Sequence, residues 1–177
     1  MIPVIQTCRT TMQIVDPCDL PDTYFNGLND PQIIGFTEAR HQKWSKDKAI
    51  RFLNINKKTR ESLIFSVKLK KESKLIGNIR LFNINKIHHR CELSFLFFDK
   101  TEWFKGYATE SVGAICDYSF DQLFIHRIHA DYYAENLASK KLFKKLGFSI
   151  EGVFKDHFFY KDRFIDSIRV AKLKGNK

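Results

Sequence analysis

A glycine-containing turn that precedes a helical pattern is the part of this sequence best suited to chemistry. The turn occupies residues 99–110, and a phenylalanine-rich run at 91–98 leads into it. The first turn of a helix has amide hydrogens without partners and the positive end of the helix dipole. Gly106 and Ala108 keep side-chain bulk away from those amides, so a phosphate could bind there. We therefore expect this turn to hold the pyrophosphate of a nucleotide-like cofactor.

The residues on either side of the turn indicate the elements that must position it. Residues 91–98 form an apolar run that is typical of a buried strand. Beyond Gly106 the apolar residues recur at helical spacing as far as Leu123. The apolar side of this helix comprises Ala108, Val112, Ile115, Cys116, Ser119, Phe120 and Leu123. A strand thus enters the turn and a helix leaves it.

The composition is that of an ordinary soluble domain. The chain has 177 residues, of which 44% are hydrophobic and 28% charged, and this length favours a single domain. No apolar run approaches the roughly 18 residues that cross a bilayer. Residues 1–9 lack the pattern of a signal peptide. We expect a cytoplasmic protein without membrane contact.

The formal net charge of +10 suits an anionic partner. Nucleic acid, an acidic membrane surface and a polyphosphate cofactor would all fit this charge. The sequence contains no RNP motif, zinc-finger spacing or arginine-rich arm, so nucleic acid is not expected. The charge therefore favours a polyphosphate cofactor.

Histidines and cysteines show no metal-ligand spacing. The four cysteines include no CxxC pair and are interpreted as small buried hydrophobes. His126 and His129 are three apart on an expected strand, so they point to opposite faces. His88 and His89 are adjacent, without a third ligand at a useful spacing. No metal is expected.

The N-terminal part has a weaker pattern. Residues 4–15 contain a possible first strand, and Asp19 is expected to cap a helix that has Pro21 in its first turn. A second helix is expected after Ser45. Its apolar positions are Ile50, Leu53 and Ile55. The aromatic and polar segment 36–44 between the helices would suit an acceptor-binding loop.

The C-terminal part alternates more clearly. A helix capped by Asn136 is expected to end at Gly147. Residues 156–163 are expected to connect the last two strands. The expected strands of this part are 63–69, 75–82, 125–133, 148–154 and 164–173. These patterns predict an α/β domain built on one mixed, mostly antiparallel sheet.

Three separated motifs carry a resemblance to a known family. Residues 103–110, 134–139 and 145–152 occur in the order and spacing of the GNAT superfamily of acyl-CoA N-acyltransferases. The chain most resembles the branch that acts on ribosomal-protein N-termini, on spermidine and on amino sugars. The resemblance covers 63–173, and more loosely the N-terminal helices. It implies one N-acetyltransferase domain over residues 1–177, with a sheet splayed between its fourth and fifth strands, flanked by helices.

The resemblance also implies how acetyl-CoA would bind. The phosphate-binding loop corresponds to Trp103, Phe104, Lys105, Gly106, Tyr107 and Ala108. Phe104 stands where a further glycine is common. The strand that ends in Phe97 and Phe98 corresponds to the one that pairs with the pantetheine arm, and Asn136 and Ser139 match positions beside that arm and the thiol.

Acetyl transfer from a thioester needs a neutral amine, a polarised carbonyl and a protonated or stabilised thiolate. Glu92, at the start of the phenylalanine-rich strand, is the carboxylate expected to take the proton of the amine. A charged residue at a strand edge is an equally good interpretation of Glu92. Asp156 and His157 are second-rank candidates for the base, although a plain turn explains them more simply. Glu110 is expected only to interact with the helix dipole.

The position of Phe143 departs from the family pattern. Many relatives, including the spermidine enzymes, have a tyrosine there that protonates the leaving thiolate. Phe143 has no acidic proton. Ser139 or Tyr133 is the expected substitute, with water as a further alternative.

The resemblance implies an acetyl-CoA-dependent N-acetyltransferase that works by direct attack of an amine in a ternary complex. A protein N-terminal amine or an amino-sugar nucleotide is favoured as acceptor, because the basic surface disfavours a polyamine such as spermidine. A homodimer is possible. The alternatives are a polyamine acetyltransferase, a catalytically weak acyl-CoA sensor or interaction module, and a basic nucleic-acid binder.

Overall fold

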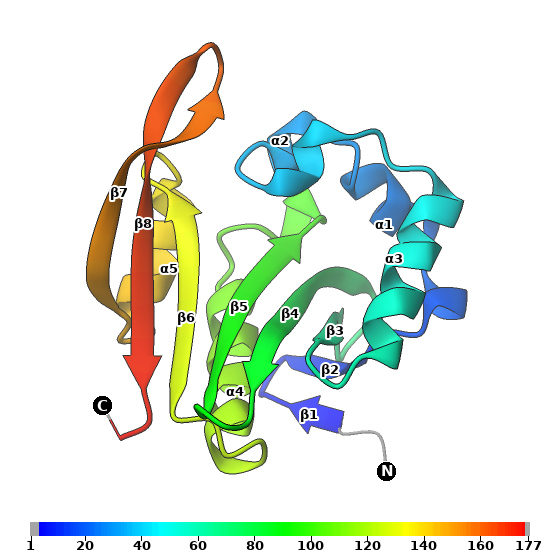
Figure 1. Cartoon of the computed structure of the whole chain (residues 1–177). Coiled ribbons are helices and arrows are strands. Elements are labelled where there is room, and N and C mark those ends of the chain that lie inside the picture. The colour runs from blue at the N-terminus through cyan, green and yellow to red at the C-terminus, as the bar shows by residue number, and fades with distance from the viewer. Residues whose placement is uncertain (1–3, 176–177) are drawn as a thin grey trace.

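One mixed sheet of eight strands runs through the chain in the order β1-β2-β3-β4-β5-β6-β8-β7 (Figure 1). The structure is a computed structural model that describes residues 4–175. Neighbouring strands are antiparallel, except that β5 and β6 are parallel. The strands are β1 (Val4–Gln6), β2 (Thr10–Ile14), β3 (Leu63–Leu69), β4 (Leu75–Asn85), β5 (Arg90–Phe97), β6 (Arg127–Tyr133), β7 (Ser149–Tyr160) and β8 (Arg163–Leu173).

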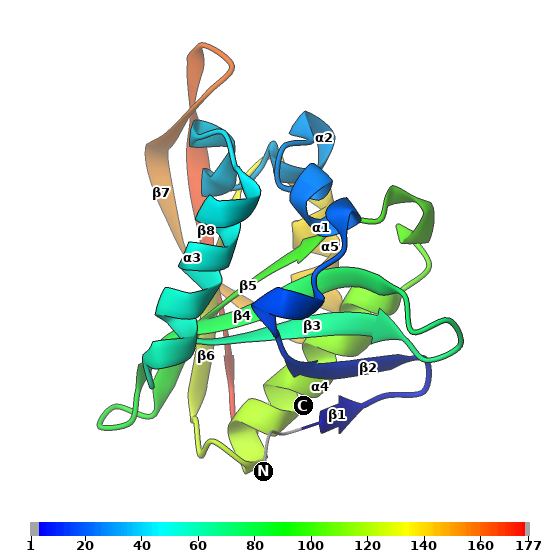
Figure 2. The ribbon, with the colours of Figure 1, turned by 90° about the vertical axis from the view of Figure 1, so that its right-hand side faces the viewer.

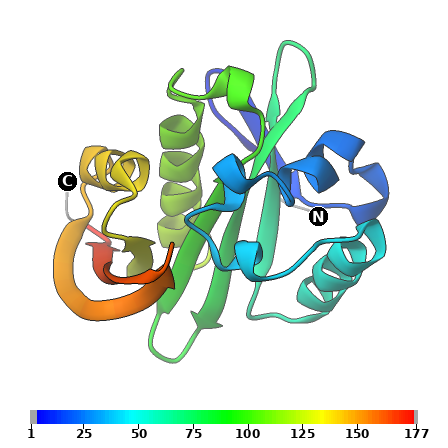
Figure 3. The ribbon, with the colours of Figure 1, turned by 90° about the horizontal axis from the view of Figure 1, so that it is seen from above.

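Helices cover both faces of the sheet. In the view from above, α4 and α5 lie against one face and α3 lies on the other (Figure 3). The β1–β2 hairpin lies beside α4 (Figure 2). The helices are α1 (Asp22–Gly27), α2 (Pro31–Ile34), α3 (Lys46–Lys58), α4 (Tyr107–Asp121) and α5 (Leu137–Lys145), with short 3₁₀ helices η1 (Pro17–Asp19), η2 (Glu38–His41) and η3 (Lys100–Glu102). Within residues 4–175 no helix is long and apolar enough to cross a membrane.

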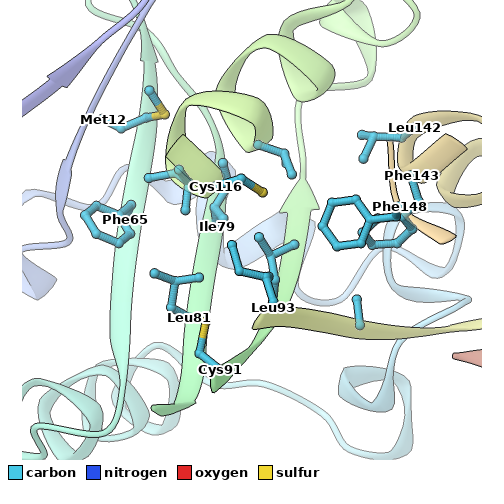
Figure 4. Packing of buried hydrophobic residues seen from close by; sticks show 14 of the residues in the cluster. Met12, Phe65, Ile79, Leu81, Cys91, Leu93, Cys116, Leu142, Phe143 and Phe148 are labelled. Carbon is cyan, nitrogen blue, oxygen red and sulfur yellow. The ribbon is translucent and has the colours of Figure 1, made fainter. Parts of the chain in front are cut away.

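Each face of the sheet buries its own apolar cluster. On the side of α4 and α5, Phe65 and Leu93 of the strands belong to one cluster with Cys116 of α4, and Phe143 of α5 packs on Phe148, which follows that helix (Figure 4). The cluster on the other side comprises Val15, Tyr24, Phe25, Leu28, Ala49, Leu53, Ile64, Leu75 and Phe98. Because successive strand residues point to opposite faces, these clusters identify the direction of each strand side chain.

The splayed sheet that the family resemblance implies is confirmed, and its expected fourth and fifth strands are β5 and β6, because residues 4–15 hold two strands. The parallel strands β5 and β6 are paired only where Arg90, Cys91 and Glu92 face Arg127, Ile128 and His129. Beyond these residues β6 continues along β8, and β5 continues along β4 (Figure 1). The strands 91–98 and 125–133 therefore diverge toward their carboxyl ends and leave an opening between them.

The N-terminal part differs from expectation. Residues 4–15 hold a hairpin of two strands, because Thr7 and Thr10 close a turn through a hydrogen bond of 2.9 Å between the Thr7 amide and the Thr10 carbonyl. Asp19 caps no helix: it lies inside η1, and α1 begins only after the extended residue Pro21. The expected cap at Asp19 is therefore wrong.

Helix α3 begins after Ser45 as predicted, and the Ser45 hydroxyl accepts a hydrogen bond of 3.2 Å from the Lys48 amide. Leu53 is buried and Ile50 packs against the same cluster. Ile55 is 63% exposed, so its assignment to the apolar side is wrong. Its place on the buried side is taken by the polar Asn56, which lies one position further along the helix.

The interpretation of the cysteines as buried residues is confirmed for Cys91 and Cys116 and wrong for Cys8 and Cys18. Burial raises the pKa of the Cys91 and Cys116 thiols to about 12, which leaves both thiols protonated at neutral pH. The two exposed cysteines lie in the β1–β2 turn and in η1, where neither faces the core.

The last hairpin is longer than expected. The prediction that 156–163 connects two strands is wrong, because β7 continues to Tyr160 and only Lys161 and Asp162 form the turn. The pairing of β7 with β8 shifts between Phe154 and Phe158, where Asp156 has a φ of 50°. The hairpin projects beyond the other strands at the end where β5 and β6 diverge (Figure 1).

Candidate active site

The turn after β5 has the backbone geometry of an anion site. Gly106 is the residue before α4 and has a φ of +87°, which favours glycine. Phe104 also adopts a left-handed backbone, with a φ of 62°, and its side chain is 95% exposed. The first bond within α4 runs from the Glu110 amide to the Gly106 carbonyl at 3.0 Å. The amides of residues 107–109 precede it and can bind a phosphate.

Arg9 lies beside this turn, and the sequence analysis did not identify it. Its Nη1 donates to the Lys105 carbonyl at 3.0 Å, and its guanidinium lies 4.5 Å from the centre of the Tyr107 ring. A Cβ added to Gly106 would come within 3.3 Å of its Nη2. Arg9 brings its Nη2 beside the helix N-terminus, while its charge is paired with Glu110 through Nε. No sequence signal could have indicated this contact, because Arg9 and Lys105 are 96 residues apart.

Glu110 connects α4 to the β1–β2 turn. Its Oε1 accepts hydrogen bonds of 2.5 Å from Thr7 and 2.8 Å from the Arg9 amide, and its Oε2 accepts one of 2.7 Å from Arg9 Nε. Burial alone would raise the pKa of this carboxyl, but the hydrogen bonds from Thr7 and Arg9 hold it below its usual value. Glu110 therefore does more than interact with the dipole, because it holds Arg9 at the turn.

The start of the turn is fixed to the end of β5. Trp103 Nε1 donates a hydrogen bond of 2.8 Å to the Phe97 carbonyl. Lys105 pairs with Glu102 at 2.9 Å within the turn. Phe97 packs on the α4 side of the sheet, whereas Phe98 is buried on the other side against Tyr24. Of the two expected pantetheine contacts, only Phe97 has its ring on the side of α4 and α5.

On the side of α4 and α5, aromatic rings cross the opening between β5 and β6. Phe143 is 3% exposed, and its ring centre lies 5.8 Å from that of Phe95 on β5 and 5.8 Å from that of Tyr132 on β6. The expected residues of α5 lie at the start of that helix. The Asn136 side chain accepts a hydrogen bond of 3.0 Å from the Ser139 amide, so Asn136 is the helix cap, and Ser139 is buried.

Glu92 lies on the opposite face, at the point where the strands separate. Asn83 Nδ2 donates to its Oε1 at 2.8 Å, and His129 Nε2 lies 3.4 Å from the same oxygen. His129 is 7% exposed, and its Nδ1 has no partner among residues 4–175. Burial lowers the pKa of His129, against the opposing effect of Glu92, so the imidazole favours its neutral form. Glu92 is thus a carboxylate beside a neutral imidazole.

Tyr133 shares this face of the sheet, and its hydroxyl is already engaged. The hydroxyl donates to Glu38 and accepts from Arg40, and its ring stacks on Phe158 with centres 3.9 Å apart. Burial, followed by the hydrogen bond to Glu38, raises the pKa of Tyr133 to about 12. The predicted catalytic residues are therefore divided: Glu92 and Tyr133 lie on one face, and Ser139 lies on the other.

The expected acceptor loop 36–44 includes η2, and it reaches this same region. Arg40 Nη2 donates a hydrogen bond of 2.8 Å to the Phe159 carbonyl on β7. The Phe36 ring packs against the rings of Tyr133 and Tyr160. Together with α2, this segment lies at the end where β5 and β6 diverge (Figures 1 and 3). Within the described part of the chain, no three His, Cys, Asp or Glu side chains gather as metal ligands.

Comparison with known proteins agrees with this geometry. The model of the acetyltransferase (GNAT) domain matches residues 9–149. This chain belongs to that family. The GNAT resemblance inferred from the three sequence motifs is therefore confirmed.

Relatives of this GNAT domain include an uncharacterized N-acetyltransferase, p20, of Bacillus licheniformis. It is 34% identical over 110 residues, which are 62% of this chain and 61% of that protein. The spermidine N(1)-acetyltransferase of Vibrio cholerae is 31% identical over 104 residues, 59% of this chain and 60% of that protein. The alignments thus span less than two thirds of these relatives.

Solved structures extend the likeness to nearly the whole fold. A spermidine N-acetyltransferase from Vibrio cholerae in complex with CoA and spermine has a TM-score of 0.85 at 26% identity, covering 96% of this chain and 98% of that one. A GNAT-family acetyltransferase from Bacillus anthracis has a TM-score of 0.83 at 24% identity, covering 97% and 98%. The single α/β GNAT fold is therefore shared with both.

Proposed function

We propose that this GNAT domain transfers the acetyl group of acetyl-CoA to a primary amine by direct attack within a ternary complex. One observation carries the proposal: β5 and β6 are paired only over 90–92 and then diverge, and the anion-binding turn directly follows β5. A long donor can run from the turn into the opening. An acceptor amine can reach the same opening from the other face, where Glu92 lies.

The residues of the turn and of β5 fit such a donor. Arg9 and the amides of 107–109 would bind the pyrophosphate. Beyond Glu92, the edge of β5 that faces β6 makes no ladder bonds to it, so its backbone groups can pair with the amides of a pantetheine arm. The bound thioester supplies the activated acyl carbon. A CoA complex of a relative with the same fold supports this assignment.

Glu92 would take a proton from the acceptor. Asn83 and His129 both lie at its Oε1, and its Oε2 has no hydrogen-bond partner among residues 4–175. Oε2 can therefore accept a proton from the ammonium form of the acceptor, whose nitrogen then attacks the thioester carbonyl. The nitrogen then gives its second proton to water. The tetrahedral centre collapses by breaking the carbon–sulfur bond, and the thiolate needs a proton.

The charges on the acceptor face favour an acceptor with a single amine. Asp131 is paired with Arg169 at 2.7 Å, and Glu151 is paired with Arg127. Because these carboxylates are already neutralised, they are poorly placed to bind the additional ammonium groups of a polycation. A protein N-terminal amine or an amino-sugar nucleotide is therefore the favoured acceptor.

Two alternatives remain to be tested beside this proposal. Polyamine acetylation is favoured by the spermidine acetyltransferases among the relatives. An acyl-CoA sensor without turnover is favoured by Phe143, which lacks a proton to give to the thiolate.

Initial-rate kinetics with an acceptor panel separate these functions. Thiol release from acetyl-CoA is followed with peptides bearing free N-termini, with amino-sugar nucleotides and with spermidine. The acetyl-CoA concentration is varied at several fixed concentrations of each acceptor. Direct attack predicts saturable release with intersecting double-reciprocal lines. Parallel lines and an acetylated protein would contradict direct attack. Release with spermidine alone would assign the polyamine function. If no acceptor of the panel causes release, the protein is the sensor.

A further inference from the structure

The leaving thiolate needs an acid on the side of α4 and α5, and we propose that Tyr132 supplies its proton. This inference rests on the proposed function. Tyr132 lies on β6, three residues beyond His129, the last residue paired with β5. Its side chain belongs to the cluster under α4 and α5, whereas its neighbour Tyr133 points to the acceptor face.

The ring of Tyr132 lies at the opening. It stacks on Phe143 at 5.8 Å with planes 25° apart, and Phe143 lies 5.8 Å from Phe95 on β5. Phe95 is three residues beyond Glu92, as Tyr132 is three beyond His129. The three rings therefore form a row from one diverging strand to the other, at the level where a donor thiol would lie after entering from the turn.

The hydroxyl of Tyr132 is the one available phenol of this row. Tyr132 is 5% exposed, and its hydroxyl makes no hydrogen bond to another residue in the described range 4–175. Burial raises its pKa, and no charged neighbour or hydrogen bond contributes to that shift. Within residues 4–175 the fully buried polar atoms without a partner are His129 Nδ1 and Ser167 Oγ, so the Tyr132 hydroxyl is reached by solvent, and a bound ligand can replace that water and accept its hydrogen bond.

The other candidates fit less well. The Tyr133 hydroxyl is held by Glu38 and Arg40 on the acceptor face. Ser139 is an aliphatic alcohol, which is a far weaker acid than a phenol. Phe143 lies in the row but has no proton to donate.

The step balances as a proton transfer coupled to bond breaking. As the carbon–sulfur bond breaks, its electron pair goes to sulfur, and the proton of Tyr132 Oη moves to the same atom. The phenolate regains a proton from water. Glu92 releases to water the proton that it took from the ammonium group. The second proton that the nitrogen loses on becoming an amide also goes to water, so one proton is released overall and the enzyme returns to its starting state.

The kinetic test compares Tyr132→Phe with Tyr118→Phe. Tyr118 is a matched control because it is a half-buried tyrosine in the same core, packs on Phe65, and has a pKa that burial also raises. We expect Tyr132→Phe to lower kcat by about 10²-fold or more, with unchanged acetyl-CoA affinity and without the basic limb of the pH profile. Tyr118→Phe should keep both kcat and that limb. A Tyr132→Phe enzyme with near-normal kcat would overturn the proposal.

A second-site variant separates chemistry from packing. Phe143 stacks on Tyr132, so Phe143→Tyr places a new phenol in the same row. In the Tyr132→Phe background it should restore kcat at least tenfold. No recovery, together with weakened acetyl-CoA binding by Tyr132→Phe, would assign Tyr132 a packing role and overturn the proposal.

A binding measurement keeps the test independent of turnover. The thiolate form of CoA accepts a hydrogen bond from Tyr132, so its affinity for the wild-type protein should rise as pH passes the thiol pKa, about 8.5 for such a group. The same titration of Tyr132→Phe should lack that rise. Equal pH dependence in both proteins would overturn the role of Tyr132, whereas absent turnover of every amine with the rise intact would overturn only the proposed function.

Discussion

Gly106 and Gly147 both have a positive φ, of +87° and +77°, but only Gly106 lies at the N-terminus of α4. An alanine at either position is expected to cost about 1–2 kcal/mol of stability through backbone strain. Gly106→Ala also brings a Cβ within 3.3 Å of Arg9, whereas a Cβ at Gly147 meets nothing within 4 Å. We expect calorimetric titration to show acetyl-CoA affinity falling at least tenfold in Gly106→Ala and unchanged in Gly147→Ala. Equal affinities would contradict the phosphate-turn assignment.

Glu110 should stabilise the protein in a pH-dependent way. Hydrogen bonds from Thr7 and Arg9 hold the pKa of its carboxyl below the usual value. A lowered pKa contributes stability above the unfolded value, and this contribution is lost as pH falls through the folded value. Glu110→Gln is therefore expected to cost about 1–2 kcal/mol at pH 7, because the bonds involve a charged group beside a half-exposed arginine.

Urea unfolding at several pH values measures that effect. The gap between wild type and Glu110→Gln should begin to narrow as pH falls below about 4.3, the pKa of an unfolded glutamate, and should be lost as pH falls through the lower folded pKa. Glu61→Gln, on an exposed residue, should leave the curve unchanged. If the difference in unfolding free energy persists undiminished at low pH, packing of the side chain and not its charge stabilises this contact.

For single residues, the sequence predicts features that depend on residues close together in the chain. Gly106 and the first turn of α4 are adjacent in the chain, so the spacing of their residues indicates the anion site directly. Arg9 meets Glu110 across 101 residues, and no single sequence carries that pairing. The short contact of Glu92 with His129 likewise depends on the register of two parallel strands.

Among the elements, Arg40 joins η2 to the β7–β8 hairpin, on the side where we propose that the acceptor binds. Arg40 donates to Tyr133 and to the Phe159 carbonyl. Arg40→Ala should loosen this junction and raise the KM of the acceptor on the order of tenfold, which corresponds to about 1.4 kcal/mol. The affinity for acetyl-CoA should not change, because the proposed phosphate-binding turn follows β5 and Arg40 makes its hydrogen bonds to Gly35, Tyr133 and Phe159.

Hydrogen exchange gives the matching structural measurement. Amides of 35–42 and of the β7 end near Tyr160 should exchange faster in Arg40→Ala. Arg51→Ala, an exposed arginine on α3, serves as the control and should change neither exchange nor KM. Unchanged exchange in Arg40→Ala would mean that the aromatic contacts of Phe36 alone hold the segment.

Periodicity predicted the long regular elements well. The expected segments 63–69 and 91–98 and the helices after Gly106 and Asn136 correspond to β3, β5, α4 and α5. The second half of β7 could not be predicted, because the irregularity near Asp156 interrupts the alternation of the strand. The expected helix capped by Asp19 failed for a different reason: Pro17 begins η1 and the extended Pro21 precedes α1, so the helix starts a few residues later.

For the whole molecule, donor binding should be visible as added stability. A ligand that binds only the folded state stabilises it by about 2.7 kcal/mol at a hundredfold excess over its dissociation constant. Acetyl-CoA should therefore raise the melting temperature with concentration. Acetyl-pantetheine, which lacks the nucleotide and its pyrophosphate, should give a much smaller shift at equal concentration. Equal shifts would mean that the basic chain, of net charge +10, does not recognise the phosphates at the turn.

The central claim is acetyl transfer to a primary amine from CoA bound at the Gly106 turn. The most direct test measures thiol release from acetyl-CoA with the amine panel, for wild type and Gly106→Glu side by side. The variant places a carboxylate at the helix N-terminus where we place the pyrophosphate, and circular dichroism verifies that it is folded. We predict saturable release by wild type with at least one primary amine, and none by Gly106→Glu. Absent release by wild type with every amine, or equal release by the folded variant, would contradict the account.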